Sequence, residues 1–150
     1  MTISALFAFL HFAAVFGIVA TIFLEWQTMS PSPTLAEARR LQLCDRWYGI
    51  FAVVVLVVGA LRVFYFEKGL AFYIRNPFFN AKLGLFVLVG LLSIYPTIRF
   101  IKWSAQTRQG LAPVVSEGEY NNIMRVLRIE VVLLLGVALC ASFMARGIGL

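Results

Sequence analysis

The sequence predicts an all-α, polytopic membrane protein, a bundle of four transmembrane helices. Three observations carry this prediction. The chain is 61% apolar, only 13% of its residues are charged, and its mean hydropathy is +0.89. The apolar residues also fall into four long runs separated by short charged stretches. A soluble domain of 150 residues has too little interior for so many apolar side chains, which excludes that class.

Each of the four runs is long enough to cross a bilayer, which takes roughly 20 apolar residues in a helix. They cover about residues 3–24, 47–66, 79–98 and 126–145. The first run has no basic segment before it and exceeds the roughly 7–15 apolar residues of a signal peptide. We therefore expect it to persist as the first helix, with residues 1–150 forming a single domain.

The second helix is predicted to begin well before its span. Residues 30–33 read Ser-Pro-Ser-Pro, and proline both lacks the backbone donor and disfavours helical geometry in the preceding residue. Thr34 then stands three residues before Glu37, the spacing of a capping box. We expect a helix from Leu35 to about Phe66.

The last two predicted helices contain a second capping-box spacing and an internal proline. Ser116 and Glu119 repeat the capping-box spacing, so the fourth helix is also predicted to begin before its span. Pro96 lies inside the third span, where it should kink the helix and free one backbone carbonyl. The hydroxyl groups of Ser93 and Thr97 are expected to help satisfy that carbonyl.

Small residues at four-residue spacing predict close helix packing. Ala13 and Gly17 form such a pair in the first span, and Gly136 and Cys140 form one in the fourth. We therefore expect a compact helical bundle that assembles into a homo-oligomer.

Cys140 and Cys44 lie far apart in this arrangement and show no CxxC or metal-ligand spacing, so we expect no disulfide.

The basic residues predict the topology. Seven lie in the stretches that join spans one to two and three to four, against three on the other face, which places both termini outside the cytoplasm of a bacterial inner membrane. The net charge of +6 is then mainly a topology signal and an attraction to anionic lipid, and no basic face suggests nucleic acid. The first group is Arg39, Arg40, Arg46, Arg99, Lys102, Arg108 and Arg125; the second is Lys68, Arg75 and Arg146.

Three polar residues fall inside the outer half of the spans, namely His11, Arg62 and Lys82. Ionisable groups in spans usually face the bundle interior or a wet cavity, so the three are candidates for one pocket. Two alternatives stay open. Arg62 and Lys82 can instead snorkel to the interface, and His11 can be a neutral histidine bonded to a neighbouring carbonyl.

One imidazole with two nearby cations suits a haem, with His11 as the ligand of the iron and Arg62 and Lys82 as partners of the two propionates. Zinc needs about four ligands, three of them from protein even in a catalytic site, and these are absent here. Copper would need further soft ligands, for which Met144 and Cys140 are the candidates in the outer half.

A second polar set lies toward the cytoplasmic side. Its charges balance well enough to be ion pairs that hold the helix ends together, and a proton path or substrate site is the alternative. Glu130 is the member deepest in a span, and Arg46 or Arg128 is its expected partner. The set consists of Glu25, Asp45, Arg46, Arg128 and Glu130.

Several segments resemble known families. The layout of the first three spans resembles HemJ-type protoporphyrinogen oxidases and the related CopD-like membrane proteins, and it rests on Leu10-His11-Phe12, Asp45-Arg46-Trp47-Tyr48 and Asn80-Ala81-Lys82-Leu83. A closer resemblance, over nearly the whole chain, is to a bacterial family of four-helix membrane proteins of unknown function. It rests on Arg62-Val63-Phe64-Tyr65-Phe66-Glu67-Lys68-Gly69, Asn76-Pro77-Phe78-Phe79 and Ser93-Ile94-Tyr95-Pro96-Thr97.

The HemJ resemblance implies haem b on His11, an essential lysine at Lys82, and oxidation of protoporphyrinogen IX coupled to electron transport, with a porphyrin or quinone as ligand. A single histidine leaves any second axial position to Met144, Lys82, water or a second subunit. The sequence thus favours a haem b-binding membrane redox protein. The alternative is a non-enzymatic carrier or assembly subunit that binds an anionic amphiphile or lipid.

Overall fold

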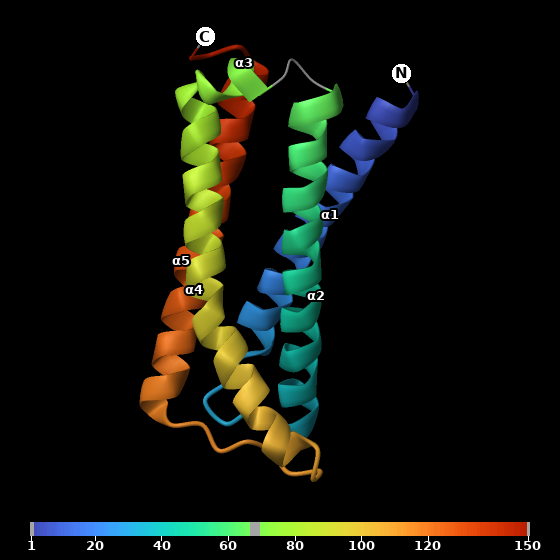
Figure 1. Ribbon diagram of the computed structural model, residues 1–150. Coiled ribbons are helices and arrows are strands. Elements are labelled where there is room, and N and C mark those ends of the chain that lie inside the picture. The colour runs from blue at the N-terminus through green and yellow to red at the C-terminus, as the bar shows by residue number, and fades with distance from the viewer. Residues whose placement is uncertain (1, 67–69, 150) are drawn as a thin grey trace.

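The computed structural model describes residues 2–66 and 70–149, and within these residues it contains helices and no strand (Figure 1). Four helices are long and apolar enough to cross a membrane. The chain is therefore a multi-pass, all-α membrane protein, as the sequence predicts. The long helices are α1 (Thr2–Thr28), α2 (Leu35–Leu61), α4 (Pro77–Thr107) and α5 (Glu117–Ala145).

Both termini lie at the same end of the bundle, which we call the terminal end (Figure 1). There α2 continues into a π-helical turn, η1 (Arg62–Phe66), and a short helix, α3 (Leu70–Ile74), precedes α4. The connections at residues 29–34 and 108–116 lie at the opposite end, the loop end. Lys68, which enters the charge count above, lies outside the described residues.

The predicted capping box at the start of α2 is confirmed. The backbone amide of Thr34 donates to Oε2 of Glu37 at 2.7 Å, and the amide of Glu37 donates to Oγ1 of Thr34 at 3.2 Å. At α5 only half of the motif forms, because the amide of Glu119 donates to Ser116 at 3.2 Å while its carboxylate accepts from Nε1 of Trp103 at 3.0 Å. This second contact ties the start of α5 to α4.

Helix α4 changes direction along its yellow stretch in Figure 1, where Pro96 is buried inside the helix. The expected satisfaction of the freed carbonyl by neighbouring hydroxyl groups is wrong. Ser93 donates to the carbonyl of Gly90 at 2.8 Å, and Thr97 donates to Oδ1 of Asp45 at 2.6 Å. Thr97 therefore links α4 to α2 instead of repairing its own helix.

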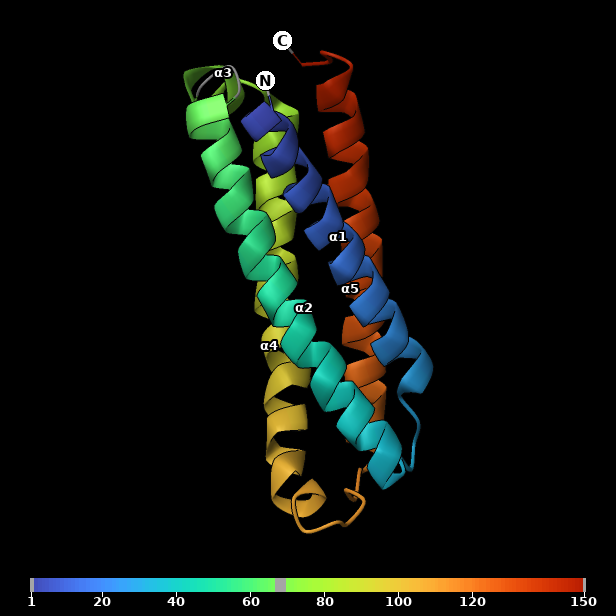
Figure 2. The same ribbon diagram turned by 90° about the vertical axis from the view of Figure 1, so that its right-hand side faces the viewer.

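The helices pack as two pairs, α1 with α2 and α4 with α5, and Figure 2 shows the first pair tilted against the second. The close approach predicted at Gly17 is confirmed, since a Cβ there would lie 2.5 Å from the ring of Phe51 on α2. Both cysteines are free, as predicted.

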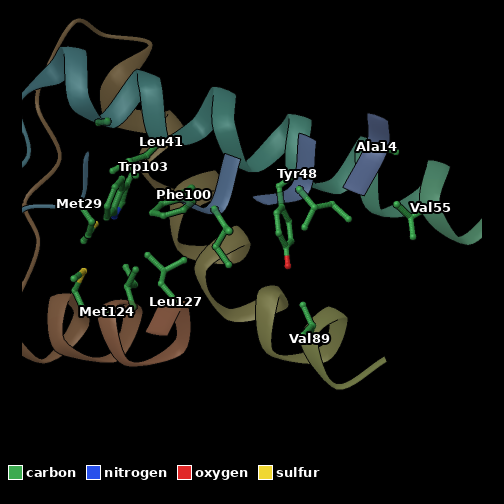
Figure 3. Packing of buried hydrophobic residues seen from close by; sticks show 14 residues of the cluster. Ala14, Met29, Leu41, Tyr48, Val55, Val89, Phe100, Trp103, Met124 and Leu127 are labelled. Atoms are coloured by element: carbon green, nitrogen blue, oxygen red, sulfur yellow. The ribbon is translucent and has the colours of Figure 1, made fainter. Parts of the chain in front are cut away.

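The hydrophobic core is concentrated toward the loop end (Figure 3). There Leu41, Phe100, Trp103 and Leu127 are almost fully buried where the two pairs meet. On α5 the buried residues all precede residue 131, so its second half has no side chain that is fully covered. The terminal half of the bundle is consequently the less tightly packed half.

Candidate functional site

His11 lies on the face of α1 that meets α2. Its imidazole makes a hydrogen bond with the backbone of Val55, while Nδ1 is buried and has no hydrogen-bond partner in the part of the chain that the structure describes. Gly59, one turn further along α2, leaves room for the ring: a Cβ at this position would come within 3.2 Å of Cε1 and 3.5 Å of Nδ1. The absence of a side chain at Gly59 thus allows the histidine to sit between the two helices.

The structure brings the three predicted site residues into one region. Arg62 and Lys82 both lie close enough to act electrostatically on His11. Arg62 opens the π-helical turn η1, with its guanidinium 5.9 Å from the ring centre of Phe12. The ammonium group of Lys82 lies 5.5 Å from the ring centre of Phe79 on α4. One cation therefore comes from each helix pair, and both belong to the terminal half.

Sequence reasoning missed the α2 residues that hold His11. Val55 and Gly59 are four residues apart, so they share a helical face, and Arg62 follows Gly59 on the same face. That spacing could have identified the face of α2 that meets the histidine. Only the contact between the helices shows that a backbone group is the partner of the imidazole.

The hydrogen bonding of His11 is compatible with a histidine that binds a metal ion. Histidines that bind metals usually donate one ring N–H to a carbonyl or carboxylate, which fixes the ring and leaves the other nitrogen for the metal. At His11 the backbone of Val55 forms a hydrogen bond with the imidazole, and Nδ1 is buried with no hydrogen-bond partner among the described residues. In the described part of the chain, no group of three or more His, Cys, Asp or Glu could hold a metal ion, so any metal here depends on a macrocycle or other ligands.

The second polar set is arranged differently from the prediction. Glu25 of α1, Asp45 of α2 and Glu130 of α5 converge in the loop half of the bundle, where Glu25 and Glu130 are 3% and 1% exposed. Arg46 and Arg128 are exposed. The expected ion pair of Glu130 with either arginine is therefore wrong, and its Oε1 has no hydrogen-bond partner among the described residues.

Arg128 points away from the interior. It lines a shallow surface groove of about 350 Å³ along α5, together with Arg125 and Tyr120. The arginine and Glu130 are two residues apart, and residues at that spacing do not share a helical face. The same rule separates Arg46 from the adjacent Asp45, which explains why balanced charges in the sequence do not become ion pairs in the fold.

Two neutral groups, the hydroxyls of Tyr48 and Thr97, complete the acidic cluster, and they were not among the residues predicted for it. Tyr48 is 6% exposed, and all three carboxyl groups act electrostatically on its hydroxyl. Figure 3 shows this hydroxyl pointing from α2 into the interior, toward the side where Val89 of α4 lies. Thr97 adds its hydrogen bond to Asp45. The three-residue spacing of Asp45 and Tyr48 is the one available signal, since it puts both on one face of α2.

Comparison with known proteins places the chain in a family. No curated protein and no solved structure matches it. The likeness to HemJ-type and CopD-like proteins therefore remains a resemblance seen in the sequence. The model of the family DUF2214, described as "Predicted membrane protein", matches residues 3–149. Since the match covers nearly the whole chain, the protein belongs to this family of predicted membrane proteins.

Proposed function

We propose that this protein binds haem b through His11 and acts as a membrane redox protein, with Arg62 and Lys82 as partners of the propionate groups. The observation that carries the proposal is the buried Nδ1 of His11, for which residues 2–66 and 70–149 provide no hydrogen-bond partner. An unpartnered polar atom in a membrane interior is costly unless a ligand engages it. Iron is a ligand that a single imidazole nitrogen can bind.

The residues around His11 have separate tasks in this proposal. The backbone of Val55 holds the ring, and the missing side chain of Gly59 leaves room for the ring between α1 and α2. Arg62 and Lys82 offer positive charge in a medium of low dielectric, which strengthens their pairing with carboxylates.

When bound, haem would supply one-electron transfer, and the enzymatic form of the proposal is oxidation of a porphyrinogen to a porphyrin, with a quinone accepting the electrons and protons that are removed. The looser packing of the terminal half favours entry of a large ligand at this end rather than at the loop end. A second copy of the chain could supply a further ligand to the haem iron, and this connects the proposal to the predicted homo-oligomer.

A second function is supported by the two cations alone. Arg62 and Lys82 come from different helix pairs and act on the same imidazole. A carboxylate or phosphate of an anionic amphiphile would be attracted to both. In this alternative the protein is a carrier or assembly subunit, and His11 is a structural group held by Val55.

The experiment is an absorption spectrum of the detergent-purified protein, oxidised in air and then reduced with dithionite, from cells supplied with a haem precursor. We expect a Soret band that shifts on reduction, and its loss in His11→Ala. Lys82→Met keeps the length of the side chain and removes its charge, so it should retain the band but release haem faster. Gly84→Ala is the matched control on α4, because a Cβ there meets nothing within 4 Å.

A colourless parent protein would overturn the haem proposal and leave the anionic amphiphile as the candidate. A Soret band that survives in His11→Ala would likewise contradict the assignment of the ligand. Light scattering on the coloured fraction, with the haem content per chain, then decides whether the bound form is a monomer or an oligomer.

A further inference from the structure

The acidic cluster in the loop half joins three carboxyl groups from three helices. Glu25 comes from α1, Asp45 from α2 and Glu130 from α5, and Asp45 and Glu130 both act electrostatically on Glu25. Thr97 of α4 bonds Asp45 at 2.6 Å, so all four long helices contribute a polar group. Around the cluster lie core residues such as Ile22 and Leu127, which are 2% and 0% exposed.

Among the described residues, no lysine or arginine forms an ion pair with the three carboxyl groups of the cluster. The groups that face it are Glu25 from α1; Cys44, Asp45 and Tyr48 from α2; Thr97 from α4; and Glu130 from α5. The basic residues nearest in sequence, Arg46 and Arg128, are exposed, and so is Arg40, which acts electrostatically on Cys44. Burying three carboxylates together without a cation would cost several kcal/mol for each charge. Some other positive species must therefore neutralise the cluster.

Two atoms identify where that species binds. Oε1 of Glu25 and Oε1 of Glu130 are buried and have no hydrogen-bond partner among the described residues. Both side chains are at least 97% covered, at 3% and 1% exposure. Within the same described part of the chain, these acids do not form a group that could hold a metal ion. A proton on the carboxyl group needs no such coordination shell, and it removes the buried charge.

We propose that Glu25, Asp45 and Glu130 form a proton-binding site inside the membrane, in which Glu25 and Glu130 hold the protons and Asp45 carries the negative charge. Asp45 has this role because it is only half-buried and its Oδ1 accepts the hydroxyl of Thr97. All three carboxyl groups act electrostatically on the Tyr48 hydroxyl, which points into the interior of the bundle (Figure 3). This inference is independent of the haem proposal, since Glu25 lies about 21 Å from His11 along α1.

The test is infrared difference spectroscopy of the full-length protein in lipid nanodiscs. At pH 7 we expect absorption from protonated carboxyl groups, with a downshift in heavy water. Glu25→Gln and Glu130→Gln should each remove one component of this absorption. Asp45→Asn should shift the components without removing one, because Asp45 is the ionised member. Glu117→Gln is the matched control, since Glu117 is an exposed glutamate at the start of α5 and should leave the bands unchanged.

The infrared spectrum of the parent protein tests the proposal even if a variant fails to fold. No protonated-carboxyl band at pH 7 in the parent protein would overturn it. Bands that persist unchanged in both glutamine variants would overturn it as well. Finally, loss of the bands when sodium, potassium, calcium or magnesium ions are added at constant pH would assign the site to a cation instead of the proton.

Discussion

At the scale of single residues, Gly17 sets how closely α1 approaches α2. A Cβ at this position would lie 2.5 Å from the ring of Phe51, which is stacked on Trp47 and cannot turn away freely. We expect Gly17→Ala to destabilise the protein by about 1–3 kcal/mol, the usual cost of overpacking. Gly90→Ala is the control, since a Cβ there meets nothing within 4 Å. Unfolding in detergent with increasing denaturant measures both; equal midpoints would contradict the close contact.

The polar residues of the candidate site could be predicted because charge stands out in an apolar run. His11, Arg62 and Lys82 are ionisable residues within apolar runs, and the structure places them in one region. Their neutral partners were not predictable, since the backbone of Val55 and the missing side chain of Gly59 leave no chemical signal in a sequence. The ion pairs predicted for Glu130 do not form, for a different reason. Neighbours in sequence such as Asp45 and Arg46 point in different directions on a helix.

At the scale of helices, the capping box of Thr34 and Glu37 fixes the start of α2. Thr34→Ala removes the side-chain acceptor for the Glu37 amide and should cost about 1 kcal/mol at this helix end. Hydrogen exchange of the amide of Glu37 should then be roughly fivefold faster. Ser116→Ala is the comparison at α5, where the reciprocal contact is absent and Trp103 holds Glu119 instead. Exchange that is unchanged in Thr34→Ala would show that the cap does not stabilise α2.

Capping signals predicted helix bounds better than hydropathy did. The apolar window of the second span begins at residue 47, but α2 begins at Leu35, where the cap predicts it. Hydropathy reports which residues suit the hydrocarbon, whereas backbone donors and breakers determine where a helix begins. The π-helical turn η1 was not predicted, because an extra residue in a helical turn has no marker in composition. It matters for the site because Arg62 is its first residue.

At the scale of the whole molecule, the bundle has two halves with different chemistry. The loop half has a dense core and encloses three carboxyl groups. The terminal half is more loosely packed and carries the histidine and two cations. The separation of the three buried acids from His11, Arg62 and Lys82 follows from which helix faces meet, and a sequence read one helix at a time does not show it. An electron-transfer site and a proton site in one bundle would allow the two processes to be coupled.

The orientation of these halves in the membrane is the remaining whole-molecule prediction. Most of the basic residues lie toward the loop end, including Arg39, Arg40 and Arg108, so this end should face the cytoplasm. Alkaline phosphatase, which is active only outside the cytoplasm, should be active when fused to the C-terminus. The same enzyme inserted at Gly110, in an exposed turn, should be inactive. The reverse pattern would place the acidic cluster nearer the outer surface, and protons would then enter it from the opposite side.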